Sequence, residues 1–173
     1  MRLFIAVLFD DEILQGLEKV QSAFRRRGVT GNYTKKENLH LTLAFIGEYP
    51  DARKVLNAVR KLRFEPFQVK LKGIGHFSDL WWAGIGTDGE LPQIAAQLRK
   101  LLAEADIPYD GKRFSPHITL VRRAEGITEK EAESIRIPFC TMTVKKISLM
   151  RSDRGKNGMI YTEIGAVEAQ PPK

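Results

Sequence analysis

Two stretches of the sequence share one pattern, HLTL at residues 40–43 and HITL at residues 117–120. The two copies use two of the three histidines in the chain. With nine Thr and seventeen Leu among 173 residues, two such copies arise by chance on the order of once in ten thousand sequences. The repeat therefore requires a structural or chemical reason.

Both copies lie in segments that predict β-strands, at residues 39–46 and around residues 117–121. Because successive side chains of a strand point to opposite faces, the His and Thr of each copy point one way and its aliphatic residues the other. Each strand then has one face for a core and one that presents an imidazole and a hydroxyl. A single copy is typical of an ordinary half-exposed strand, whereas two copies indicate a shared site.

The predicted site contains four side chains, His40, Thr42, His117 and Thr119. Imidazole can remove one proton and deliver another near neutral pH, because its ordinary pKa lies closest to neutrality. A threonine hydroxyl two residues away is a donor for a charged tetrahedral group such as phosphate. A metal centre is a weaker interpretation, since no carboxylates stand at ligand spacing from the two histidines. The four residues therefore predict phosphodiester chemistry without a metal.

The composition indicates a globular chain with an anionic partner. At 43% hydrophobic content the chain can bury a core as one compact unit. A formal charge of +7 favours nucleic acid over a neutral metabolite. The single cysteine, Cys140, excludes a disulfide framework and a Cys-rich zinc site. The apolar run at residues 2–9 is too short for a membrane span and lacks a cleavage site, so we expect a soluble cytoplasmic protein. We also expect a monomer with no obligatory protein partner.

Hydrophobic periodicity predicts an alternation of strands and helices along the chain. The expected strands are residues 2–9, 39–46, 67–71, 80–85, 117–121, 139–149 and 159–164, and the expected helices are residues 11–27, 51–63, 90–105 and 128–135. Each half of the sequence supplies one motif strand, and no linker separates the halves. We therefore predict two packed α+β lobes in one domain, residues 1–167, followed by a disordered tail, residues 168–173.

The sequence resembles the two-histidine (2H) phosphoesterase superfamily, and within it the RNA 2′,3′-cyclic phosphodiesterase branch, historically called 2′-5′ RNA ligase. The stretches that carry the resemblance are residues 1–6 (MRLFIA), 38–47 (NLHLTLAFIG), 114–122 (FSPHITLVR) and 148–152 (SLMRS). It implies a bilobal α+β fold with pseudo-twofold symmetry, in which two antiparallel sheets line a central cleft and helices cover the outer faces. Ile46, where the family commonly has Leu, and the loop after Ser152 depart mildly from its pattern.

The resemblance also implies a reaction in which water opens an RNA-terminal 2′,3′-cyclic phosphate and leaves a 2′-phosphate. By this resemblance His40 donates the proton to O3′, His117 accepts the proton of water, and Thr42 and Thr119 hold the phosphate. No cofactor is implied. The family also joins 2′-5′ ends by the reverse reaction.

Further residues are candidates for contact with RNA. Arg122 matches the Arg that closes the second family motif, and Tyr161 resembles a C-terminal aromatic residue of the family. Lys112 and Phe114 flank the second motif strand in sequence, so we expect them to contact RNA as well. Two other functions stay open: a 2H phosphoesterase acting on another cyclic or 2′-5′ linked nucleotide, and a non-catalytic RNA-binding protein.

Three other features favour structural interpretations. The third histidine, His76, lacks a Thr two residues later and is flanked by glycines, which favours a structural or surface role. Residues 84–89 match a GxGxxG pattern, but residues 87–90 are better explained as a capping box for the following helix. Trp81 and Trp82 are adjacent in a strand, so one ring should enter the core and the other should face away.

Overall fold

The computed structural model describes residues 1–171, and within that range the chain forms nine strands, four α-helices and one 3-10 turn. The strands are β1 (Arg2–Leu8), β2 (Thr30–Tyr33), β3 (His40–Glu48), β4 (Phe67–Phe77), β5 (Leu80–Gly86), β6 (Ile118–Glu125), β7 (Thr141–Val144), β8 (Lys146–Gly155) and β9 (Gly158–Glu168). The helices are α1 (Asp11–Arg26), α2 (Ala52–Val59), α3 (Glu90–Glu104) and α4 (Glu129–Glu133), and the 3-10 turn is η1 (Lys36–Asn38).

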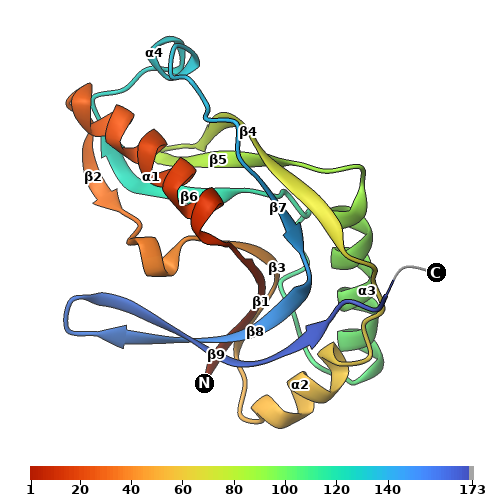
Figure 1. Ribbon diagram of the computed structural model, residues 1–173. Helices are drawn as coiled ribbons and strands as arrows, with labels where there is room; N and C mark the ends of the chain where they lie inside the picture. The colour runs from red at the N-terminus through yellow and green to blue at the C-terminus, as the bar shows by residue number, and fades with distance from the viewer. Residues whose placement is uncertain (172–173) are drawn as a thin grey trace.

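The strands form two sheets, sheet A with the order β3-β1-β8-β9 and sheet B with the order β2-β6-β5-β4-β7. Every strand pairing is antiparallel. In Figure 1, sheet A occupies the lower part of the molecule and sheet B the upper part. The predicted α+β fold with two antiparallel sheets is therefore confirmed.

The two lobes interlock, because successive elements alternate between the sheets. Helix α1 follows β1 of sheet A but packs on β4, β6 and β7 of sheet B. Helix α3 follows β5 of sheet B and packs on β3 of sheet A beside α2. Sheet A also joins strands from both ends of the chain. The lobes thus differ from the two sequence halves that the motif spacing suggested.

Strand β1 lies inside sheet A, and its side chains are buried on both faces. Leu3, Ile5 and Val7 enter the main core, whereas Phe4 and Ala6 belong to a second, smaller cluster on the opposite face. This explains why the strand is a continuous apolar run rather than an alternating one.

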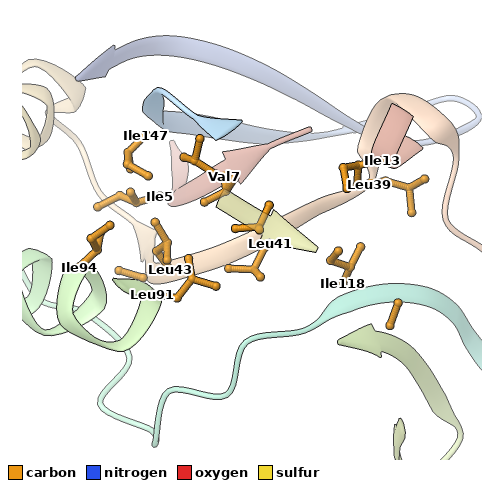
Figure 2. Packing of buried hydrophobic residues seen from close by; sticks show 14 of the residues in the cluster. Ile5, Val7, Ile13, Leu39, Leu41, Leu43, Leu91, Ile94, Ile118 and Ile147 are labelled. Carbon is orange, nitrogen blue, oxygen red and sulfur yellow. The ribbon is translucent and has the colours of Figure 1, made fainter. Parts of the chain in front are cut away.

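The first motif strand, β3, follows the predicted alternation. Leu41 and Leu43 are buried in the main core, where Figure 2 shows them near Leu91 and Ile94 of α3. Burial of each such leucine stabilises the fold by roughly 1.5–3 kcal/mol. Their packing holds the opposite face of β3 toward the other sheet.

Two predicted segments differ from the structure in more than their bounds. Residues 139–149 were expected to form one strand, but Lys145 separates β7 of sheet B from β8 of sheet A. Apolar residues alternate at positions 142 and 144 and again at 147 and 149, and the change of phase at Lys145 and Lys146 marks the point where the chain changes sheet. Residues 30–33 were expected to be a loop, but they form the edge strand β2, whose largely exposed side chains carry no apolar period.

The C-terminal segment is ordered beyond the predicted boundary at residue 167. Glu168 ends β9, the main-chain N–H of Ala169 donates to the carbonyl of Lys145 (2.8 Å), and that of Gln170 donates to Phe64 (2.9 Å). The Gln170 side chain in turn accepts a hydrogen bond from the main-chain N–H of Phe64 (2.9 Å). These bonds correct the expectation of disorder from Glu168 onward, and the last part of that tail, residues 172–173, lies outside the described residues.

Among residues 1–171, no helix has the length and apolar character needed to cross a membrane.

Candidate active site

The four motif side chains lie together at one cavity of about 320 Å³ between the two sheets. His40 and Thr42 come from β3 of sheet A, whereas Thr119 lies in β6 of sheet B and His117 immediately precedes that strand. The remaining lining residues are Arg2, Phe4, Phe45, Arg122, Ser152, Met159 and Tyr161. The lining contains two arginines and no carboxylate, which favours an anionic ligand.

His40 is fixed on three sides. Its Nδ1 donates to the main-chain carbonyl of Asn38 (2.7 Å), and its Nε2 lies 3.0 Å from the hydroxyl oxygen of Thr42. The imidazole also packs against the rings of Phe4 and Tyr161, with centroid distances of 4.9 and 5.2 Å. In the neutral imidazole, Nε2 is therefore the acceptor and receives the proton of the Thr42 hydroxyl.

His117 has the same main-chain anchor as His40. Its Nδ1 donates to the carbonyl of Ser115 (2.6 Å), which again lies two residues earlier in the chain. The edge of its ring meets Phe77, with a centroid distance of 5.2 Å. Within residues 1–171 its Nε2 makes no hydrogen bond. Both histidines therefore keep the proton on Nδ1 and present Nε2 for chemistry.

The environment lowers the pKa of His40 below its ordinary value of 6.5. Burial is the largest cause, since it disfavours the charged imidazolium, and the positive charges of Arg122 and His117 act in the same direction. The hydrogen bond to Asn38 opposes them by favouring the protonated ring. His40 is therefore neutral at pH 7 in the free protein.

A β-bulge brings Arg122 into the cavity. Thr119 and Arg122 are three residues apart, so strict alternation would place them on opposite faces of β6. The register with β5 shifts at Leu120, which lies opposite no residue of that strand, and both Thr119 and Arg122 line the cavity. The carbonyl of Leu120 accepts hydrogen bonds from the main-chain N–H of Thr34 (2.9 Å) and from Nε2 of Gln21 (3.0 Å).

Of the four predicted RNA contacts, the structure brings two to the cavity. Arg122 and Tyr161 line it. Lys112 is exposed, and its main chain bonds to Asp110 and Arg99 in the loop before the second motif. Phe114 is half-buried and packs against the main core. Nearness in sequence to His117 does not bring these two residues to the cavity, because regular strand structure begins only at Ile118.

Sequence reasoning missed several lining residues. Phe4 and Phe45 belong to the second cluster, and the unbroken apolar run of β1 could have indicated a second buried face. Asn38, whose carbonyl anchors His40, also donates from its side chain to the carbonyl of Met159 on β9 (2.9 Å). No sequence pattern marks Asn38 or Met159, because their roles depend on the approach of the β8–β9 hairpin.

The third histidine lies outside the cavity, as predicted. His76 stacks on Trp81 with a centroid distance of 4.5 Å, and its Nε2 lies 2.6 Å from a carboxylate oxygen of Glu129. The Glu129 carboxylate is the main cause that raises the pKa of His76 above 6.5. This contact connects β4 to α4, which is a structural role.

The remaining two features also have structural roles. Trp81 is buried, and Trp82 is half-buried on the opposite face with its ring centroid 6.3 Å from that of His117. In residues 84–89, Gly89 is the N-cap of α3, the Thr87 hydroxyl accepts from the Gly89 main chain (3.3 Å), and the Glu90 carboxylate accepts from that of Asp88 (2.8 Å). The side chains of Thr87 and Glu90 thus cap the start of α3, as predicted. They accept from the main chain of Gly89 and Asp88, however, and not from each other's main chain as in a capping box.

A second cavity, of about 640 Å³, adjoins the first and is called the outer cavity below. The two share His40, Thr119, Arg122, Met159 and Tyr161, so they form one continuous space. The outer cavity extends between β2 and the turn of the β8–β9 hairpin. Within residues 1–171, no group of three or more His, Cys, Asp or Glu side chains is arranged to hold a metal ion.

Several known proteins are similar to this chain over almost its whole length. An RNA 2′,3′-cyclic phosphodiesterase of Archaeoglobus fulgidus is 30% identical, with 97% of this chain and all of the relative covered. A protein of the same name from Thermus thermophilus is 32% identical, with 99% and 96% covered. Among solved structures, E. coli LigT superposes with a TM-score of 0.79 at 26% identity, covering 97% of this chain and 96% of that one, and it has also been crystallised with 3′-AMP.

A family model described as the 2′-5′ RNA ligase superfamily matches residues 9–156. This range includes both His-x-Thr motifs, all of sheet B, and strands β3 and β8 of sheet A. The match confirms the resemblance on which the site prediction drew. The chain belongs to the 2′-5′ RNA ligase superfamily.

Proposed function

We propose that this protein hydrolyses a 2′,3′-cyclic phosphate at the end of an RNA strand and leaves a 2′-phosphate. The observation that carries the proposal is the matched pair of histidines, each with its Nδ1 proton held by a carbonyl two residues earlier, at one cavity rich in positive charge. Relatives that bear the name of this activity, and the 3′-AMP complex of LigT, support RNA as the partner.

In the proposed reaction, Nε2 of His117 takes a proton from water while the water oxygen attacks phosphorus. The bond between phosphorus and O3′ breaks, and O3′ receives the proton from Nε2 of His40. The products are a 2′-phosphate monoester and a free 3′-hydroxyl. Arg122 and the hydroxyls of Thr42 and Thr119 hold the non-bridging oxygens, on which negative charge grows in the transition state.

His40 must gain a proton before it can act as the acid. In the free protein its pKa is lowered by burial and by the charge of Arg122. A bound phosphodiester places a negative charge beside His40 and Arg122. This charge offsets the positive charge of the Arg122 guanidinium and favours the protonated imidazole of His40. Substrate binding therefore raises the pKa of His40 and charges the acid only when there is a leaving group to protonate.

The test is hydrolysis of a short oligoribonucleotide ending in a 2′,3′-cyclic phosphate, with and without EDTA. We expect a 2′-phosphate product under both conditions, and a bell-shaped pH dependence of kcat/KM from one acid and one base. The variants His40→Ala and His117→Ala should each lose about a hundredfold or more in kcat, the contribution typical of general acid or base catalysis.

His76→Ala is the matched control, since it removes the one histidine outside the cavity and should keep the activity. Activity that survives in both His40→Ala and His117→Ala would contradict the mechanism. A 3′-phosphate product would contradict the assigned leaving group.

A second candidate activity is the cleavage of a 2′-5′ linkage, which reverses 2′-5′ joining. The neutral state of His40 in the free protein favours it, because a neutral imidazole can take the proton of a 3′-hydroxyl that attacks the 2′-phosphodiester. The bond between phosphorus and O5′ would break, and O5′ would take its proton from a protonated His117. The products would be a 2′,3′-cyclic phosphate and a free 5′-hydroxyl. A 2′-5′ linked dinucleotide distinguishes the two activities, since hydrolysis of a cyclic end alone leaves it intact.

A further inference from the structure

The outer cavity is large enough to accept most of a nucleotide. Its volume of about 640 Å³ lies within the range of small-molecule sites, roughly 300–1,000 Å³. One wall is the edge strand β2 with the following residues Thr34 and Lys35, and the other is the hairpin from Asn157 to Tyr161. Because it opens directly onto the catalytic cavity, a ligand held by the two histidines can extend into it.

The charges of the outer cavity are suited to a phosphate. Among its lining residues, Lys35 and Arg122 are charged, and none is an aspartate or glutamate. Nζ of Lys35 donates to the carbonyl of Asn157 (2.6 Å), which ties the ammonium group to the hairpin turn. An ammonium group has three protons, so two stay available for a ligand. The outer cavity thus offers a positioned cation away from the motif side chains.

A terminal nucleotide carries its two phosphates on opposite sides of the ribose. If the cyclic phosphate lies at the histidines, the outer cavity offers room for the ribose and its 5′ side beside the residues that line both cavities. Arg122 lines both cavities, whereas Lys35 lines only the outer of the two. Arg122 is thus placed for the cyclic phosphate, and Lys35 is placed for the phosphate on the 5′ side.

We propose that the outer cavity binds the terminal nucleoside and that Lys35 binds the phosphate on its 5′ side. Lys35 is then a specificity residue that selects an RNA end, or a 5′-phosphorylated nucleotide, over a nucleoside 2′,3′-cyclic phosphate. This inference rests on the proposed function, because it takes the position of the cyclic phosphate from it.

The test compares adenosine 2′,3′-cyclic phosphate with its 5′-phosphorylated form and with the dinucleotide ApA ending in a 2′,3′-cyclic phosphate. In the wild-type protein, kcat/KM for the last two should exceed that for the first by about tenfold or more, the effect of one hydrogen bond between charged groups. In Lys35→Ala this ratio should fall to near one, and in Lys35→Arg it should be largely restored.

Lys36→Ala is the matched control, because Lys36 is the adjacent lysine, pairs with Glu18 (3.7 Å) and lines neither cavity. It should keep the wild-type ratio. The proposal is overturned if Lys35→Ala lowers kcat/KM equally for all three substrates. It is also overturned if the wild-type protein hydrolyses all three with similar kcat/KM.

Binding of two product analogues separates this proposal from the proposed function. Adenosine 2′,5′-bisphosphate should bind more tightly than adenosine 2′-phosphate by a factor that depends on Lys35, as measured by calorimetry. If none of the three substrates is hydrolysed but this preference is present, the proposed function fails and the phosphate site stands. If hydrolysis occurs but the preference is absent, the proposed function stands and the site fails.

Discussion

Gln21 and Leu120 are joined by a buried hydrogen bond that connects helix α1 to the β-bulge of β6. Nε2 of Gln21 donates to the carbonyl of Leu120 (3.0 Å) and also to the carbonyl of Thr34 (2.8 Å). Gln21 is only 3% exposed, so water does not replace these bonds. One side chain thus holds both the bulge that turns Arg122 into the site and the segment that leads to Lys35.

Replacement of Gln21 by Met keeps the volume of the side chain but removes its donors. We expect the free energy of unfolding to fall by about 1–3 kcal/mol, because a buried hydrogen bond to Leu120 and a partly buried one to Thr34 are lost. We also expect kcat/KM to fall, because Arg122 loses its fixed position. Denaturation in urea and steady-state kinetics measure the two effects.

Gln15→Met on the exposed face of the same helix is the control and should change neither quantity. If Arg122 carries the catalytic effect, the losses in Gln21→Met and Arg122→Gln should be less than additive in the double variant. Fully additive losses would separate Gln21 from the site.

Arg122→Gln should raise the pKa of His40 in the free protein, because the Arg122 charge is one of the causes that lower it. Titration of the imidazole carbon-bound protons by NMR measures this shift directly. Arg123→Gln removes the adjacent arginine, which is not among those causes, and should leave the titration curve of His40 in place. An unchanged His40 curve in Arg122→Gln would show that the charge of Arg122 does not contribute to the lowered pKa.

The stability of the protein should depend on pH through His40. Its pKa is lowered below 6.5 in the folded state, so the unfolded chain binds the proton first as the pH falls. The free energy of unfolding therefore decreases as the pH is lowered from about 6.5 through the pKa of the folded state, and His40→Asn should remove that decrease. Urea denaturation between about pH 5 and 8 tests this.

His76 should make the stability depend on pH in the opposite direction. Glu129 raises its pKa, so its contribution to stability is present below 6.5 and is lost as the pH rises through the raised value. His76→Asn should therefore change the pH dependence in the direction opposite to His40→Asn. The same direction for both variants would contradict these assignments.

Gly75→Ala should displace Trp82 and weaken the site around His117. An added Cβ would lie only 2.2 Å from a ring carbon of Trp82, which packs against Phe77 and lies near His117. The forced repacking should cost about 1–3 kcal/mol of unfolding free energy, and kcat should decrease. Gly111→Ala, where nothing lies within 4 Å of the added carbon, should leave both values near wild type.

The repeated motif and the alternation of side chains together predicted that the four motif residues face a common place, and the structure brings them to one cavity. The alternation works because Leu41 and Ile118 are buried, so each strand has a fixed orientation. The same rule would place Arg122 on the wrong face of β6, and only the family resemblance suggested it. A bulge depends on hydrogen bonds from distant residues, here Gln21 and Thr34, and leaves no period in the sequence.

Lys112 and Phe114 are predicted RNA contacts that do not line the cavity. Both stand close to His117 in the sequence, but the segment between α3 and β6 is irregular. Without a strand or helix period, nearness along the chain does not determine direction. Lys35 is the reverse case, since it lies far from the second motif in sequence and is brought to the outer cavity by the hairpin carbonyl of Asn157.

Sheet A has a consequence for protein synthesis, because β1 lies between β3 and β8. A ribosome-bound chain that ends before Lys146 already contains both histidine motifs, but one edge of β1 lacks its partner strand. The ring of Tyr161 and the backbone of Met159, which complete the surroundings of His40 and Asn38, have not yet been made. The nascent protein therefore cannot close the surroundings of His40 until β9 has been translated.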